Sequence, residues 1–152
     1  MRKKRIRLKS FDYLGAYRYF VTICTHNQKQ AFTSEGRVRT VSDILKETAE
    51  QEGFTVWAWC FMPDHLHILV EGVNEKSDLR RFMKIFKQKS GYQWKQIEGE
   101  KLWQEDYFER ILRREETTPK VIEYILNNPV RRGLVSSPEE YPFSYSLLDN
   151  NM

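Results

Sequence analysis

The chain has 152 residues, of which 40% are hydrophobic and 30% charged, as expected for one soluble domain with one core. No apolar run is long enough to span a membrane, and the basic start MRKKRIRLKS leads into no apolar signal-peptide core, so we expect a cytoplasmic protein. The net charge of +4 is modest, and Cys24 and Cys60 lie in apolar runs that predict buried, reduced thiols.

In chain order, residues 1–10 predict a flexible basic arm and residues 11–152 a single domain. Aromatic and β-branched residues predict four strands, at 17–25, 54–62, 65–71 and 103–112. Helical spacing of apolar residues predicts three helices, from about 40 to 52, from a cap at 77 or 78 to about 97, and from a cap at 117 or 118 to 127 or 128. Residues 26–37 predict a loop, and the segment after Pro129 predicts irregular structure that packs back onto the domain.

The order of these elements predicts an α+β fold of the ferredoxin-like split βαββαβ type, followed by one further helix. In such a fold the two crossover helices cover one face of an antiparallel sheet, and the other face is left for a site or a partner. The further helix contains Tyr124.

Two of the three histidines of the chain, His65 and His67, are two residues apart on a predicted strand. Alternate strand residues point to the same face, so the two imidazoles project side by side, while Leu66 and Ile68 have the character of core. A histidine pair on a central strand favours metal binding. The alternative is a pair of polar residues on an exposed strand.

A catalytic metal usually takes a third protein ligand and keeps open positions. Tyr124 and Asn128 are four residues apart and share one helix face, so Asn128 could offer its amide oxygen to Mg²⁺ or Mn²⁺ beside the Tyr124 phenol. A phenol near such a metal can attack a phosphodiester and keep the bond energy in a covalent phosphotyrosine. The alternatives are a core or interface role for Tyr124 and a helix-capping role for Asn128 before Pro129.

These motifs resemble those of the HUH-type single-tyrosine transposases, the transposase IS200-like family. The run FMPDHLHILVE resembles the strand that carries the histidine pair of that family, and VIEYILNNPVRRGLV resembles the tyrosine helix of its REP-associated branch. The runs VTICTHNQKQAF, WQEDYFERIL and YPFSY are similar to that branch as well. The resemblance spans roughly residues 13–146, with the motifs in the family's order.

The resemblance implies a ferredoxin-like domain in which His65 and His67 match the metal pair, Tyr124 the nucleophile and Asn128 the third ligand. It implies cutting and rejoining of single-stranded DNA near hairpins, with Mg²⁺ or Mn²⁺ and a 5′-phosphotyrosine intermediate. It also implies repetitive palindromic targets outside genes. The branch is usually monomeric whereas classical relatives are dimers, and the sequence leaves monomer and homodimer open.

Three basic segments are candidate DNA contacts, although a disordered tail or a solvated helix face would contain the same residues. They are Arg2, Lys3, Lys4, Arg5 and Arg7 in the arm, Arg80, Arg81, Lys84 and Lys87 in the second predicted helix, and Arg131 and Arg132 after the tyrosine helix. Two other functions fit parts of the pattern. One is a module of the same fold that binds DNA hairpins without cutting, and the other is an RNA-binding ferredoxin-like domain with exposed strand aromatics.

Overall fold

A computed structural model describes residues 11–149, and the predicted basic arm of residues 1–10 lies outside the described residues. The centre of the fold is a five-stranded sheet in the order β4-β1-β3-β2-β5, in which all the paired strands are antiparallel. The strands are β1 (Arg18–Cys24), β2 (Phe54–Met62), β3 (His65–Gly72), β4 (Phe108–Ile111) and β5 (Ser144–Ser146). The first four have the strand order of the predicted ferredoxin-like unit, which the structure confirms.

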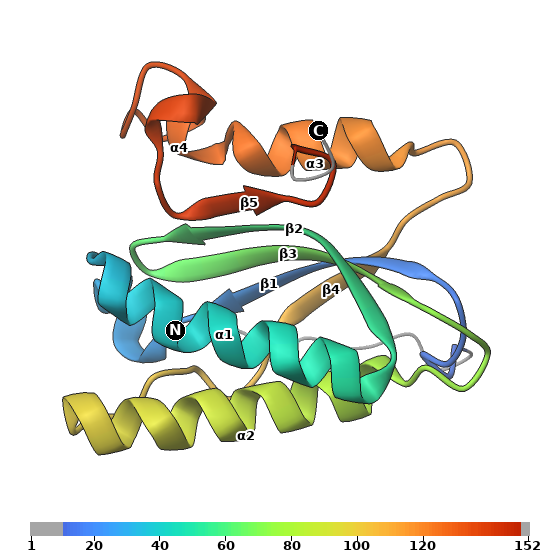
Figure 1. Cartoon of the computed structure of the whole chain (residues 1–152), viewed down its shortest axis with the longest axis horizontal. Helices are drawn as coiled ribbons and strands as arrows, with labels where there is room; N and C mark the ends of the chain where they lie inside the picture. The colour runs from blue at the N-terminus through green and yellow to red at the C-terminus, as the bar shows by residue number, and fades with distance from the viewer. Residues whose placement is uncertain (1–10, 150–152) are drawn as a thin grey trace.

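Two long helices lie side by side on one face of this sheet (Figure 1). Helix α1 spans Glu35–Glu52 and helix α2 spans Leu79–Glu98, and Ser34 and Asp78 cap their N-termini by accepting hydrogen bonds from backbone N–H groups. The helices end at Gly53 and Gly99, whose φ angles of 75° and 79° are left-handed. The predicted loop over 26–37 is wrong at its end, because Ser34 begins α1 and Gly36 lies inside the helix.

The opposite face of the sheet is covered in part by the C-terminal third of the chain (Figure 1). Helix α3 (Thr118–Leu126) packs on β2 and β3, and buries Val121, Ile122 and Ile125 in a second apolar cluster. The prediction that this face stays open is therefore only partly right. Helix α3 covers this face with apolar side chains, and the histidines provide its polar part.

Two further expectations are corrected by the structure. The predicted strand over 103–112 is reduced to β4, because residues 104–107 form a loop. Trp103 keeps only an isolated antiparallel bridge to Thr25, and its indole N–H donates to the Ser90 hydroxyl at 2.8 Å. The segment after Pro129 is not wholly irregular, since β5 pairs with β2 at the sheet edge. Two 3-10 helices complete the elements, η1 (His26–Gln28) and η2 (Pro138–Glu140).

The tyrosine helix is also divided differently from the prediction. Helix α3 ends at Leu126, and a short helix α4 (Asn128–Arg131) follows directly. Pro129 stands in the first turn of α4, where its missing N–H leaves no helical hydrogen bond unmade. The proline thus starts a new turn, and Asn128 becomes the first residue of the second helix.

Candidate active site

The central strand β3 presents the histidine pair on the face opposite α1 and α2. Leu66 and Ile68 are fully buried in the core under the two long helices. His65 and His67 point to the other side, and their Nε2 atoms lie 3.1 Å apart. The predicted alternation along this strand is confirmed, and two imidazole nitrogens converge on one point.

Each imidazole is held from behind through its Nδ1 atom. The Asp64 Oδ1 atom lies 2.7 Å from Nδ1 of His65, and the Thr22 Oγ1 atom lies 2.9 Å from Nδ1 of His67. When Nδ1–H of His65 donates to the Asp64 carboxylate, the proton is fixed there and Nε2 keeps its lone pair. A carboxylate or hydroxyl behind the imidazole is the arrangement that orients metal-binding histidines.

Electrostatics favour the neutral form of His67. Burial is the largest cause that lowers the pKa of His67, the electrostatic effects of His65, Arg131 and Arg132 act in the same direction, and together they bring it to about 3. A neutral imidazole offers a lone pair and can therefore bind a cation, whereas an imidazolium cannot. The charge state of this side chain suits a metal ligand.

The chemistry of the donor set fits a divalent cation. Within residues 11–149, no group of three or more His, Cys, Asp or Glu side chains is placed to hold a metal ion. Cations bound by His65 and His67 would thus take the remaining ligands from the Asn128 amide, water or substrate oxygens. Asn128 is 7% exposed, and its side chain makes no hydrogen bond to another residue of the described part.

The neighbouring cysteines do not join this donor set. Cys60 pairs with His67 across β2 and β3, and burial raises the pKa of its thiol to about 12 although Arg131 opposes the shift. The protonated thiol is a poor ligand. Within residues 11–149 neither Cys24 nor Cys60 forms a disulfide, and Cys60 is buried as predicted whereas Cys24 is only half-buried.

Tyr124 stands on α3 one aromatic ring away from the histidine pair. The centroid of the Phe20 ring lies 5.5 Å from that of His67 and 6.0 Å from that of Tyr124. The Tyr124 side chain is exposed, at 56%, so its hydroxyl is open to a macromolecular substrate. The alternative of a core role for Tyr124 is therefore wrong.

Arg131 ties α4 to the tyrosine. Its guanidinium carbon lies 3.9 Å from the centroid of the Tyr124 ring, and its Nη2 donates to the Tyr124 carbonyl oxygen at 2.8 Å. Arg131 and Arg132 both contribute to the lowered pKa of His67, so both charges act on the site. A cationic side chain beside the exposed phenol suits an anionic substrate.

The basic residues predicted on the second helix lie elsewhere. Helix α2 covers the opposite face of the sheet, so Arg80, Arg81, Lys84 and Lys87 do not reach the histidines (Figure 1). Arg81 pairs with Glu52 at 2.8 Å, Lys87 donates to two backbone carbonyls, and Arg80 lies over the Tyr13 ring. The candidate DNA contacts Arg2, Lys3, Lys4, Arg5 and Arg7 are outside the described residues.

Sequence reasoning missed three residues of this site. Asp64 immediately precedes His65, so the run Asp-His-Leu-His contained the signal for a carboxylate behind the histidine. Thr22 reaches His67 because the antiparallel register places the two residues opposite each other on β1 and β3. Phe20 follows from the same register, and no spacing in the sequence reveals either one.

Comparison with known proteins places these features in a family. The family model described as "Transposase IS200 like" matches residues 14–128. A relative from Haemophilus influenzae is 25% identical over 146 residues, which cover 88% of this chain and 81% of the relative. The REP-associated tyrosine transposase of Escherichia coli K12 is 25% identical over 136 residues, or 87% of this chain and 78% of that protein.

A solved structure has the same fold. It is that of a REP-associated tyrosine transposase bound to a REP hairpin, with a TM-score of 0.74 and 21% sequence identity, and the match covers 95% of this chain and 82% of that one. No helix within residues 11–149 combines the length and the apolar character needed to cross a membrane.

Proposed function

Because this chain belongs to the transposase IS200-like family, we propose that it nicks and rejoins single-stranded DNA next to hairpins of the REP type. The proposal includes a divalent metal, Mg²⁺ or Mn²⁺, and a covalent 5′-phosphotyrosine on Tyr124. The observation that carries it is the convergence of the Nε2 atoms of His65 and His67, 3.1 Å apart, near an exposed tyrosine. The hairpin in the related solved structure supports the choice of substrate.

The cutting step is a transfer of one phosphoryl group. The Tyr124 hydroxyl attacks the scissile phosphorus and loses its proton as the new P–O bond forms. The bond from phosphorus to the 3′ oxygen breaks, and that oxygen leaves as a 3′-hydroxyl after it takes up a proton. A divalent cation held by His65, His67 and Asn128 would polarise the phosphate and orient the leaving oxygen.

Rejoining is the reverse of this step with a 3′-hydroxyl as the attacking group. The phosphotyrosine retains the energy of the broken diester, so no external source of energy is needed for resealing. Arg131, which packs on the Tyr124 ring, contributes a positive charge next to the phosphate in both directions.

The basic residues of α2 have a separate part in this proposal. Arg80, Lys84 and Lys87 lie on the face away from Tyr124, so they cannot contact the scissile phosphate. They can contact the backbone of the paired stem, since a hairpin presents a double row of phosphates beyond the single-stranded cut site. Binding to the stem would be strongly dependent on salt concentration.

The test is a covalent-adduct assay with end-labelled hairpin oligonucleotides that have single-stranded flanks. The wild-type protein is incubated with Mn²⁺, with Mg²⁺ and with EDTA, and adducts are separated on denaturing gels. Tyr124→Phe is the key variant, and Tyr92→Phe is its matched control because Tyr92 is exposed too, at 66%, but lies on α2.

We expect a metal-dependent adduct in the wild type and in Tyr92→Phe, and none in Tyr124→Phe. Tight hairpin binding without an adduct in any metal would contradict the cutting activity. The protein would then be a hairpin-binding module of the same fold. An adduct that survives Tyr124→Phe would assign the nucleophile to another residue.

A further inference from the structure

A row of side chains with two aromatic rings between two arginines crosses the sheet face that contains the histidines. The guanidinium carbon of Arg110 lies 5.9 Å from the centroid of the Phe20 ring. Phe20 contacts the rings of both His67 and Tyr124, and Arg131 covers the far side of Tyr124. The row therefore runs from the edge strand β4, across β1, to the junction of α3 and α4.

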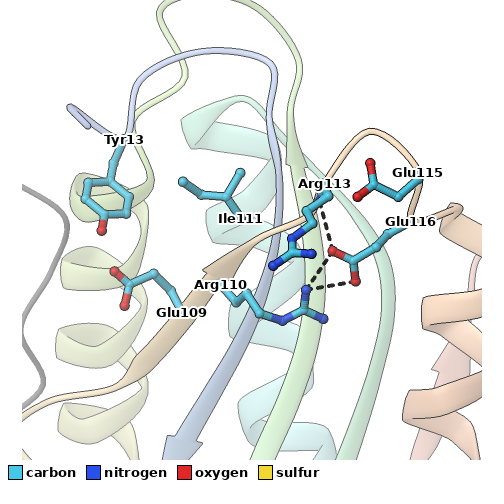
Figure 2. A pocket seen from close by; sticks show the side chains of 7 residues that line it. All are labelled: Tyr13, Glu109, Arg110, Ile111, Arg113, Glu115 and Glu116. Carbon is cyan, nitrogen blue, oxygen red and sulfur yellow. Dashed lines mark hydrogen bonds and ion pairs between the residues drawn. The ribbon is translucent and has the colours of Figure 1, made fainter. Parts of the chain in front are cut away.

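Strand register explains why Arg110 lies on this face. Phe20 pairs with Arg110 on β4 and with Leu69 on β3, and Thr22, two residues further along β1, pairs with His67. Residues opposite each other in an antiparallel pair share a face, so Arg110 and Phe20 belong to the histidine face. Glu109 points the other way, toward Tyr13, as Figure 2 shows.

Glu116 holds the Arg110 side chain in a fixed position. Nη1 of Arg110 donates to both carboxylate oxygens of Glu116, at 2.7 and 2.8 Å, and the backbone N–H of Arg113 donates to the same carboxylate (Figure 2). The hydrogen bond from Arg110 and that from Arg113 hold the pKa of Glu116 below its usual range. The carboxylate thus stays ionised and orients the guanidinium.

The guanidinium still has donors to offer. Only Nη1 is engaged by Glu116, and within residues 11–149 no acceptor is bonded to Nε or Nη2 of Arg110. The side chain is 53% exposed. A pre-oriented arginine with unused N–H groups loses little entropy when it binds a phosphate.

The cavity on the outer side of β4 is not the place for that phosphate. It has a volume of about 600 Å³ and is lined by Arg110 and Arg113, but also by the carboxylates of Glu109, Glu115 and Glu116. Three carboxylates around one cavity repel an anion. On the histidine face, Arg110 instead neighbours the uncharged Phe20 ring.

We propose that Arg110 and Phe20 form a nucleotide-binding subsite for the single-stranded DNA that flanks the scissile phosphate. In this subsite Arg110 binds a backbone phosphate, and the Phe20 ring packs against the adjoining nucleotide. Proteins that bind a single strand without base readout usually combine cationic side chains with aromatic rings. The inference rests on the proposed function for the identity of the strand, and it adds where that strand lies.

Its test measures binding and does not depend on cutting. The full chain with Tyr124→Phe is titrated with a hairpin that has a single-stranded DNA flank and with the same hairpin without the flank. The ratio of the two dissociation constants isolates the contribution of the flank. Arg110→Ala and Phe20→Leu are added to this background, and Arg39→Ala is the matched control.

Arg39 suits that purpose because it is an exposed arginine with one glutamate partner, Glu35, on helix α1. We expect Arg110→Ala and Phe20→Leu each to reduce the contribution of the flank about ten-fold, the usual scale for one stacked or charged nucleotide contact. Arg39→Ala should leave it unchanged. Thermal melts check that Phe20→Leu is folded, and the exposed Arg110 gives a second, independent variant.

If Arg110→Ala and Phe20→Leu both leave the contribution of the flank equal to that of the Tyr124→Phe background, the subsite is overturned. Tighter binding of the same hairpin with an RNA flank would also overturn it, since the subsite would then belong to RNA. The proposed cutting activity can fail separately. Absence of an adduct together with a flank effect that Arg110→Ala removes would reject the transposase chemistry and support the subsite.

Discussion

The two faces of the central sheet are built from the same strands but are stabilised in different ways. On the side of α1 and α2, Leu66, Ile68 and Val70 are held by close packing, which has no direction and is shared by many neighbours. On the other side, the Nδ1 atoms of His65 and His67 are each held by one directional hydrogen bond, to Asp64 and to Thr22. Packing on the first face can adjust to a changed side chain, whereas a hydrogen bond on the second face is lost when its acceptor atom is removed.

The largest effect is expected on the polar face. His67→Ala removes one of the two converging nitrogens and should lower the rate of adduct formation about a thousand-fold, since a Lewis-acid metal supplies several kcal/mol of transition-state stabilisation. Adduct formation under a Mn²⁺ titration measures the loss. His26→Ala, on η1, is the control. An unchanged rate in His67→Ala would reject the metal pair.

The complementary change on the apolar face is Ile68→Ala. Ile68 is fully buried, so its truncation should reduce the free energy of unfolding by about 2–5 kcal/mol. Urea denaturation gives this value. Adduct formation per folded molecule should stay near that of the wild type. A large loss of rate in the folded variant would show that the two faces are not independent.

A smaller effect is expected for Asp64, the hydrogen-bond partner of His65. Asp64→Ala removes the carboxylate that orients His65 through Nδ1, and such changes lower metal affinity or activity roughly 10- to 100-fold. Asp64→Asn, which keeps an acceptor oxygen, should restore part of the activity. If Asp64→Asn and Asp64→Ala behave alike, the contact does not orient the imidazole.

A weaker effect is expected from a change at the linker between β4 and α3, residues 112–117. Arg18 donates from β1 to the carbonyl oxygens of Arg113 and Glu116 and to the hydroxyl of Thr118. Arg18→Gln should cost about 1–2 kcal/mol of stability and lower the adduct rate by a similar free energy, because the nucleophile is less well placed. Calorimetry of Mn²⁺ binding should show unchanged affinity, and an altered affinity would contradict a role limited to the linker.

The smallest effect should come from the cap of α1. Ser34→Ala removes the acceptor for the Arg37 N–H and should cost about 1 kcal/mol of stability. The adduct rate and the metal dependence should not change. Thermal melting measures the cost, and any loss of activity in the folded variant would mean that the helix face influences catalysis.

The sequence alone predicts the apolar face better than the polar one. Strand β2 and the histidine strand were predicted within one residue, because β-branched and apolar alternation reports burial directly. Helix α1 was predicted five residues too short, since Gly36 was interpreted as a loop residue although Ser34 provides a cap. Strand β5 was missed because three residues form a strand only by pairing with β2.

The candidate site shows the same limit. Local motifs point to His65, His67, Tyr124 and Asn128, since each stands in a recognisable run of sequence. Thr22, Phe20 and Arg110 are all far in sequence from the two histidines. They reach the site only through the pairing of β1 with β3 and β4, which is a tertiary property. The α2 lysines and arginines are predicted as DNA contacts from their charge alone, and charge does not report the face on which a helix packs.

The alternation along β3 has a consequence for how this protein can change over generations. A slip of one residue in the pairing of β3 would turn the histidines into the core and expose Leu66 and Ile68. Any mutation that disturbs this pairing therefore disrupts the core and the histidine pair at the same time. As long as the fold is selected, the facing of the histidine pair is inherited along with the core.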